Sequence, residues 1–593
     1  MPWATGLPPS AVKAVSPICA GPRELVVAWR TVMRGRTDRN MSGAKGGKAC
    51  LAGLPAADQA TGLWPGLMRK GKFALLLHAH LPYVRHPEHE DFLEEDWFYE
   101  AIAETYVPLL RVFERLAAER APVRVTMSIT PTLGAMMEDP LLGERAARHL
   151  DRSVALAESE VSRTAGDVAA RELAEFYLER FRATRDYFAA RGGRLIPAFR
   201  ALQDAGLLEI ITCAATHGFL PLMAEHPEAV RAQILTACDY HRELFGRQPS
   251  GIWLPECAYF PGLGNYLSEA DLKWFVLDAH GLMFGKPQPR LAIYAPCYTT
   301  EGPAVFARDR DSSRQVWSQE EGYPGDPAYR DFYRDIGYDL PLDYLRPFLG
   351  GDAQRKFTGL KYHRITGRTE HKELYHRPWA EAAAEAHAAD FLANRIRQFE
   401  PLCAEMPVEP VLVSPFDAEL FGHWWFEGPE FLDLFLRKAA YDQDVFELTT
   451  PTDYLAGHEI LQVVEPCASS WGNKGYSEVW LDQSNAWIYP HLHAAARRMT
   501  EMARRHEKTR SKTKEETLRQ MGRELLLAQA SDWAFLMRTG TAKDYAAKRT
   551  KDHLLRFNRL YDILRSGRTD KDFLAACRER DNIFPDLEWR YYL

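Results

Sequence analysis

The stretch Gly251–Tyr259 (GIWLPECAY) has the form of a short buried strand that ends in an acidic residue. Its apolar run stops at Pro255, Glu256 follows at once, and Trp253 and Tyr259 flank the carboxylate. Strand ends of this form carry a carboxylate into an aromatic-lined cleft. A buried, paired glutamate at a strand end is an equal alternative on this stretch alone, so the other strands must decide between the two.

Five further apolar runs have the length and composition of buried strands. Runs with helical periodicity separate several of them, at 96–120, 226–246 and 380–400. Strands that alternate with helices form a parallel sheet or barrel, and such folds place functional residues at the carboxyl ends of the strands. The predicted strands lie at 73–77, 123–129, 207–212, 272–278 and 411–416.

Polar residues directly follow several of the predicted strands. They are His78 and His80 after the first strand, His217 after the third, and Asp417 after the last. Alternate positions of a strand point to the same face, so the first two histidines share one. A metal site is the weaker interpretation, because no Asp, Cys or His stands at a tight ligand spacing. Hydrogen bonding to a polar substrate, or to a catalytic carboxylate, is favoured.

Three segments depart from the alternation of strands and helices. The run 139–200 is rich in Ala, Glu, Arg and Leu, which predicts a helical insert with a charged hinge near 160–168. The segment 299–356 is rich in Gly, Pro, Asp and Tyr, which is typical of binding loops or a lid. The last part of the chain is helical and charged, which predicts a C-terminal helical domain at 456–593 that contributes to the cleft.

Residues 1–69 are rich in Gly, Ala, Pro, Arg and Lys and have no sustained hydrophobic period. Such a segment cannot bury enough apolar surface to fold, so we expect a disordered extension. Met68 directly precedes the basic stretch 69–72 (RKGK) and the first predicted strand, and is the alternative start of the domain. The predicted catalytic domain spans 70–455.

The composition excludes several classes of partner. A net charge of -7 lacks the basic excess that binds phosphate backbones, so no nucleic acid is expected. No apolar run approaches the ~20 residues of a membrane helix. The 9 cysteines include no C-x-x-C pair, which argues against a zinc ribbon or disulfide framework and favours a cytoplasmic location. We expect a monomer or a small homo-oligomer. No glycine-rich nucleotide loop follows a strand, so no cofactor is expected.

Two carboxylates at strand ends, histidines at two others and no cofactor motif point to one kind of chemistry. In retaining glycoside chemistry one carboxylate attacks the anomeric carbon, and the other transfers protons. Aromatic rings bind sugars by stacking, and several tryptophans stand near these motifs in the sequence. They are Trp253, Trp424, Trp425, Trp471 and Trp480.

The strand-end motifs resemble, in order, the signature regions of glycoside hydrolase family 57. The resemblance extends over about residues 70–560, and within that family it is strongest to the 1,4-α-glucan branching enzymes. The motifs that carry it are His78–Tyr83 (HAHLPY), Ala215–Gly218 (ATHG), Trp253–Tyr259 (WLPECAY), Pro415–Trp424 (PFDAELFGHW) and Ser469–Gly472 (SSWG) with Trp480.

The resemblance implies an α/β fold, a distorted seven-stranded (β/α) barrel with a helical insert and a C-terminal all-helical domain. It implies cleavage of α-1,4-glucan with retention, Glu256 as nucleophile, Asp417 as general acid/base, and neither metal nor cofactor. Trp471 and Trp480 would close the cleft and stack on glucose. The implied substrate-binding residues are His78, His80, His217, Trp253, Arg334, Gly351, Trp424, Trp471, Trp480, Asp532 and Thr541.

Two departures from the family keep other activities open. Relatives often carry a tyrosine, linked to transfer over hydrolysis, in a mobile loop that corresponds to about 299–317 here. This stretch has Phe306 and no tyrosine, although Tyr298 and Tyr323 flank it. Thr541 also stands where relatives have a longer polar residue. An α-glucan hydrolase, a 4-α-glucanotransferase and a non-catalytic glucan-binding protein are therefore the alternatives to a branching enzyme.

Overall fold

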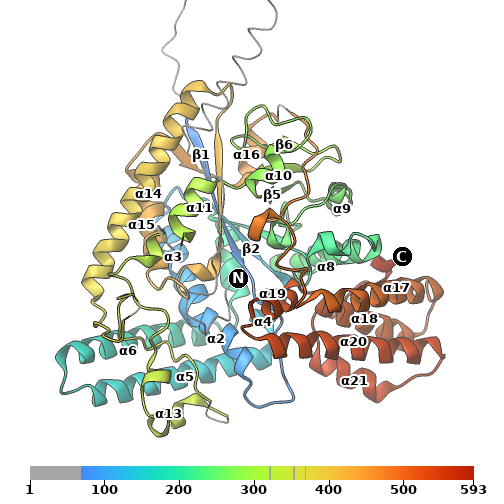
Figure 1. Cartoon of the computed structure of the whole chain (residues 1–593), viewed down its shortest axis with the longest axis horizontal. Helices are drawn as coiled ribbons and strands as arrows, with labels where there is room; N and C mark the ends of the chain where they lie inside the picture. Colours follow the sequence, from blue (N-terminus) through green and yellow to red (C-terminus); the bar gives the residue numbers. More distant parts are fainter. Residues whose placement is uncertain (1–68, 319–321, 352–353, 368, 461) are drawn as a thin grey trace, which may run out of the picture.

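The chain has an α/β fold built on one large, mostly parallel sheet (Figure 1). The computed structural model describes residues 69–318, 322–351, 354–367, 369–460 and 462–593. The extension expected at 1–69 lies outside the described residues, except for Arg69. The strands are β1 (Gly71–Ala79), β2 (Val125–Ile129), β3 (Leu208–Cys213), β4 (Gly251–Trp253), β5 (Trp274–Leu277), β6 (Cys297–Tyr298), β7 (Ala304–Ala307), β8 (Val411–Asp417) and β9 (Phe446–Leu448).

The six strands predicted from apolar runs are present, and they pair in parallel. The strand order is β6-β7-β5-β4-β3-β2-β1-β8, with β9 paired to β1 and only β6 antiparallel to its neighbour. The register places His78 opposite both Ser128 and Asp417, so three strand ends meet there. The Asp309 N–H donates to the Val413 carbonyl at 2.8 Å. The sheet therefore curls until the chain leaving β7 meets β8.

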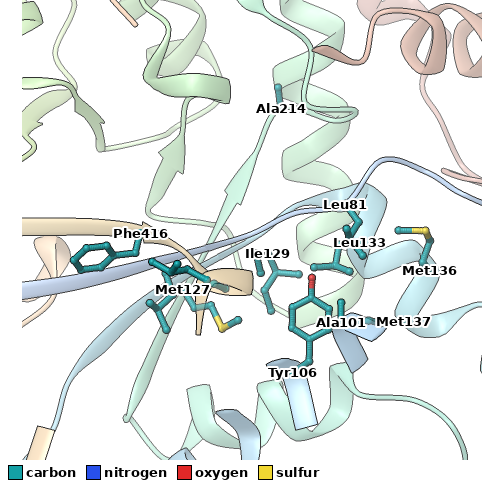
Figure 2. Close-up of a cluster of buried hydrophobic side chains, with 14 of the residues drawn as sticks. Leu81, Ala101, Tyr106, Met127, Ile129, Leu133, Met136, Met137, Ala214 and Phe416 are labelled. Carbon is teal, nitrogen blue, oxygen red and sulfur yellow. The ribbon is translucent and has the colours of Figure 1, made fainter. Parts of the chain in front are cut away.

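Helices cover the curled sheet and bury its apolar runs. Phe73 of β1 packs edge-on against Phe435, with ring centroids 5.6 Å apart. Figure 2 shows Met127 and Ile129 of β2 grouped with Tyr106 and Leu133 from the helices beneath. The covering helices are α2 (Asp96–Ala101), α3 (Val107–Ala118), α4 (Pro131–Glu138), α8 (Pro227–Phe245), α9 (Leu263–Glu269), α10 (Ala279–Met283), α14 (Arg377–Glu405), α15 (Gly428–Tyr441) and α16 (Pro451–Gly457).

A helical hairpin occupies the predicted insert. Helices α5 (Pro140–Arg163) and α6 (Val168–Ala190) pack together and extend away from the sheet (Figure 1), and the short α7 (Ile196–Asp204) returns the chain to β3. The chain turns between α5 and α6 within the stretch 160–168, where the sequence predicted a hinge. Asp139 and Asp167 begin the two long helices by accepting hydrogen bonds from Leu142 and Ala170, respectively.

The segment 299–356 is less loop-like than the sequence predicted. It contains β7, which lies in the sheet, followed by α11 (Arg310–Trp317), α12 (Ile336–Asp339) and α13 (Leu342–Leu349). Phe306 belongs to β7 and is buried edge-on between Trp274 and Tyr454, with centroids 6.0 and 6.1 Å away. The expectation that Phe306 belongs to a mobile loop is therefore wrong. A strand of only four residues, directly after Gly302 and Pro303, is too short to reveal a period.

Helices make up most of the last hundred residues. The helices are α17 (Tyr489–Arg505), α18 (Lys512–Ala528), α19 (Ser531–Thr539), α20 (Lys543–Arg565) and α21 (Lys571–Arg580), and they gather on one side of the sheet (Figure 1). In the described part of the chain, no helix is both long and apolar enough to cross a membrane.

Gly422 fixes the chain that leaves the end of β8, and its replacement provides a test of this packing. Its φ is +120°, and an added Cβ would meet the backbone carbonyl oxygen of Glu104. We expect Gly422→Ala to lower the free energy of unfolding by at least about 2 kcal/mol, because neither strain nor clash can relax cheaply. The thermal midpoint measures the effect. Gly457→Ala is the matched control, since nothing lies within 4 Å of its added Cβ. Equal midpoints for the two variants would contradict the prediction.

Candidate active site

Glu256 stands on a sharp turn directly after β4. The turn runs through the short 3-10 helix Pro255–Cys257, where Glu256 has φ 60° and ψ 25° and Cys257 has φ 51°. Residues other than glycine rarely adopt this left-handed conformation, which costs on the order of 1–3 kcal/mol and is concentrated at functional sites. The turn buries Glu256 to 6% exposure. The strained, buried carboxylate favours a functional over a purely structural role.

A segment more than two hundred positions later holds the Glu256 turn in place. Tyr259 and Ser469 exchange backbone hydrogen bonds of 2.9 and 3.2 Å, and the Trp471 N–H donates to the Glu256 carbonyl at 2.9 Å. The Trp471 indole N–H also donates to Glu256 Oε2 at 2.6 Å. Trp471 packs edge-on against Trp253, with ring centroids 4.9 Å apart. Trp471 therefore positions both the backbone and the carboxylate of Glu256.

His78 and His217 form a neutral hydrogen-bonded pair beside Glu256. Their Nε2 atoms are 3.1 Å apart, so one ring donates and the other accepts. Only one of the two Nε2 atoms can therefore carry a proton. Each Nδ1 is held by a serine hydroxyl, Ser128 at 3.2 Å and Ser531 at 2.9 Å. Burial, followed by neighbouring histidine charge, lowers the pKa of both rings well below its ordinary value. His217 Nδ1 lies 4.0 Å from Glu256 Oε1.

His80 joins the strand ends to the C-terminal helices. Its ring stacks on His217 with centroids 3.8 Å apart, and its Nδ1 contacts the Thr130 hydroxyl at 3.0 Å. Its Nε2–H donates to the Asp532 carboxylate, at 3.1 Å from each oxygen. Asp532 lies in the first turn of α19, and the Ser531 N–H donates to the His217 carbonyl at 3.1 Å. The helical C-terminal region thus completes this wall of the site.

Asp417 ends β8 and is accompanied by a second acid, Glu419. Asp417 is 5% exposed, and its Oδ1 has no hydrogen-bond partner among the described residues. Glu419 is 1% exposed and accepts from the His80 N–H at 3.0 Å and from the Tyr106 hydroxyl at 2.5 Å. Burial, reinforced by the Asp417 charge, raises the pKa of Glu419 to about 8. The sequence assigned no role to Glu419.

The two carboxylates expected to react have different surroundings. Burial raises the pKa of Glu256 above its ordinary value, and the charge of Asp417 adds to the rise, but the Trp471 donor opposes it. Burial also raises the pKa of Asp417, while the charges of Arg308 and His80 oppose that rise. Among the described residues, a hydrogen-bond donor contacts the carboxylate of Glu256 and none contacts that of Asp417, so Glu256 is the member of the pair better able to carry the negative charge.

Arg308 and Asp278 are site neighbours that the sequence analysis missed. The Arg308 guanidinium lies 5.5 Å from the Trp471 ring centroid and 3.5 Å from Asp278. Burial opposes ionisation of Asp278, but the hydrogen bond from His280 and the charges of Arg308 and Arg310 lower its pKa well below its ordinary value. Asp278 directly follows β5, and this position at a strand end could have identified it as a site residue. Arg308 follows β7, which the sequence analysis did not detect.

Within the described residues, five of the expected substrate-binding residues make no hydrogen bond, salt bridge or ring contact with this cluster. Trp480 is 1% exposed and stacks on Phe219 at 4.5 Å, so its face is covered and cannot stack on glucose in this conformation. Trp424 stacks on Phe332, and Arg334 pairs with Asp339. The other two lie on loops. The Gly351 N–H donates to Asp91, and Thr541 bonds to Thr539.

The fold brings together side chains of the kinds that bind metals, although these residues are far apart in the sequence. The donor atoms of His78, Cys213 and His217 lie within 4.8 Å of one another, as do those of His80, His217 and Asp532. Spacing along the chain could not reveal these groups. The histidines are engaged with one another and with hydroxyl or carboxylate partners, which suits hydrogen bonding. The absence of a metal requirement stays a prediction.

Comparisons with known proteins agree on one family. A family model described as glycosyl hydrolase family 57 matches residues 74–465, and one described as 1,4-alpha-glucan branching enzyme, C-terminal, matches 491–592. A 1,4-alpha-glucan branching enzyme of Thermococcus kodakarensis is 34% identical over 560 residues, which cover 87% of this chain and 77% of the relative.

Two solved structures cover most of the chain. The alpha-amylase AmyC of Thermotoga maritima is 43% identical with a TM-score of 0.83, covering 88% of this chain and 99% of that one. A GH57-type branching enzyme of Pyrococcus horikoshii is 32% identical with a TM-score of 0.79, covering 88% and 97%. With the match over 74–465 and the strand-end geometry, these comparisons show that the chain belongs to glycoside hydrolase family 57.

Proposed function

We propose that the chain is a 1,4-α-glucan branching enzyme, which cleaves an α-1,4 bond with retention and forms an α-1,6 branch. The match of residues 491–592 to the branching-enzyme C-terminal region is the observation that carries the proposal. The branching enzymes of Thermococcus kodakarensis and Pyrococcus horikoshii also support it. A glycogen-type polymer would be the product, and α-1,4-glucan the substrate.

The proposed reaction has two steps. The Glu256 carboxylate attacks the anomeric carbon while Asp417 donates its proton to the glycosidic oxygen, which leaves as the 4-hydroxyl of the released glucan. Asp417, now a carboxylate, takes the proton from the 6-hydroxyl of an acceptor glucose. That oxygen attacks the glucosyl ester, releases Glu256 and forms the α-1,6 bond. Two inversions at one carbon give net retention.

The surroundings of the two acids suit these roles. The Trp471 indole stabilises the ionised Glu256, as a nucleophile requires, and the buried Asp417 keeps a raised pKa, as a general acid requires. We propose that His78, His80, His217 and Asp532 form the polar wall that binds sugar hydroxyls. Trp253 lies behind His78 at a centroid distance of 5.1 Å and shapes the floor.

We further propose a division of the fold into functional parts. The seven parallel strands β1, β2, β3, β4, β5, β7 and β8 would form a distorted (β/α) barrel that carries both acids, within a catalytic domain at 70–455. The Asp309 to Val413 hydrogen bond supports this closure. Residues 456–593 would form a second, helical domain that supplies Trp471 and Asp532 to the cleft.

An α-amylase is the second candidate function. The 43% identity to an enzyme described as an alpha-amylase supports it. The missing tyrosine is weaker support than the sequence suggested, because part of the stretch in question is the buried strand β7. In hydrolysis, water would take the place of the acceptor 6-hydroxyl, so only the second step differs.

Incubation with linear amylose separates the two functions. We expect proton NMR to detect new α-1,6 anomeric signals that exceed the gain in reducing ends. Glu256→Gln should reduce both signals by on the order of 10⁴-fold, the scale on which loss of a nucleophile acts, with an unchanged thermal midpoint. Glu478→Gln, at an exposed position, is the control that should retain activity. Reducing ends without α-1,6 signals would make the enzyme an amylase.

The pH profile of turnover tests the assignment of Asp417. A general acid must be protonated, so activity should fall as pH rises through its pKa, which burial places above the ordinary value of 3.8. Asp417→Asn should lower turnover of glucans by about 10²–10⁴-fold. The variant should still cleave an α-glucosyl fluoride, because fluoride leaves without a proton. Its activity on that substrate should no longer fall at alkaline pH. An unchanged alkaline limb in the variant would refute the assignment.

Glu419 should make stability depend on pH. Its pKa of about 8 in the folded chain exceeds the ordinary 4.5, so the folded state holds the proton more tightly than the unfolded state. The contribution of Glu419 to stability is therefore fully present below about pH 4.5 and is lost as pH rises through about 8. Thermal midpoints from pH 5 to 8 should decline less in Glu419→Gln than in the wild type. Glu459→Gln, at an exposed position, should retain the wild-type slope, and a common slope for all three proteins would count against the pKa shift.

A further inference from the structure

Three metal-ligand side chains meet away from the proposed active site, where α8 begins and α17 runs beside it. Glu225 and His226 immediately precede α8, and His493 lies in the second turn of α17. One donor atom from each lies within 4.8 Å of the other two. The two imidazole rings are 5.1 Å apart between centroids and are tilted by 45°. Figure 1 shows the two helices side by side.

Neither imidazole has a hydrogen-bond partner within the part of the chain that the structure describes. The ring nitrogens of both side chains are therefore available as ligands. A neutral imidazole has a free lone pair, which is the form that binds a metal ion.

We propose that His226, His493 and Glu225 bind a zinc ion that links α8 to α17. Two imidazoles and one carboxylate form a ligand set typical of zinc, whose bonds to nitrogen and oxygen are about 2.0–2.2 Å long. These lengths place ligand atoms roughly 3.3–3.6 Å apart in a tetrahedron, so the side chains need to close by about 1 Å. The exposed Glu225 can rotate to do so, and water takes the fourth position.

Competition favours this group over the other candidate donor groups. Among the described residues no salt bridge engages Glu225, and the nearby Glu228 is already paired with Arg504 at 2.8 Å. In contrast, the Arg556 guanidinium already occupies the buried group of Glu524, His553 and Asp581, at 3.0 Å from Glu524 and 2.7 Å from Asp581. The histidines at the strand ends are engaged by hydroxyl and carboxylate partners.

The zinc would lie behind the wall of the active site. His226 and His493 line a shallow pocket, together with Phe219, Ala530 and Ser531. Ser531 contacts the His217 ring from the other side, and Phe219 supports Trp480. A zinc ion that holds α8 to α17 would therefore stabilise the attachment of the C-terminal helices that deliver Asp532.

Zinc binding to the full chain tests the proposal directly. Protein treated with a chelator is dialysed against zinc chloride, and its metal content and thermal midpoint are measured. Wild type should retain one zinc ion more than His226→Ala or His493→Ala, and zinc should raise its midpoint. His491→Ala is the matched control, because His491 is exposed on the same helix two residues from His493. This control should behave as wild type.

A third variant separates loss of the site from loss of folding. Glu225→Gln changes one exposed side chain, so its midpoint without zinc should equal that of wild type. Its zinc affinity should fall at least roughly tenfold. Loss of a group that only hydrogen-bonds a metal ligand already has an effect of this size. Equal zinc content and equal zinc-dependent midpoints in wild type and in all three ligand variants would overturn the proposal.

Discussion

The active-site cluster depends on hydrogen bonds between segments that are distant in the sequence. The Glu256 turn is held by Trp471 through both its backbone and its carboxylate. His217 is held by Ser531, and His80 by Asp532. Each bond satisfies a polar group that the sheet has buried, and a buried polar group without a partner costs on the order of 1–3 kcal/mol. The sheet alone would therefore leave its own strand ends unsatisfied.

Much of the fold could be predicted from local patterns. The apolar runs at β1, β2, β3 and β8 are long enough to be recognised, and their alternation with helices indicates a parallel sheet. β7 could not be recognised, because four residues show no period and flanking glycine and proline are also typical of loops. The burial of Phe306 depends on Trp274 and Tyr454, which approach it only in the folded sheet.

The site residues that lie at strand ends could be predicted from the sequence, and the other site residues could be predicted less well. Glu256, Asp417 and the three histidines directly follow apolar runs, so parallel pairing alone brings them towards one edge of the sheet. Arg308 depends on the strand that was missed. Trp480 was expected to stack on sugar, but a tryptophan that packs on Phe219 has the same local sequence signal as one that faces a cleft. Only the tertiary surroundings separate the two.

The contact between His80 and Asp532 joins residues 452 positions apart, and it has a consequence for the order of synthesis. A chain that emerges amino end first presents Glu256 and Asp417 long before Asp532 leaves the ribosome. Its strand-end histidines then lack their last partner, and a nascent chain holds an unfinished site. The strand-end histidines therefore gain their full set of partners only after the C-terminal helices have been made and have packed against the sheet.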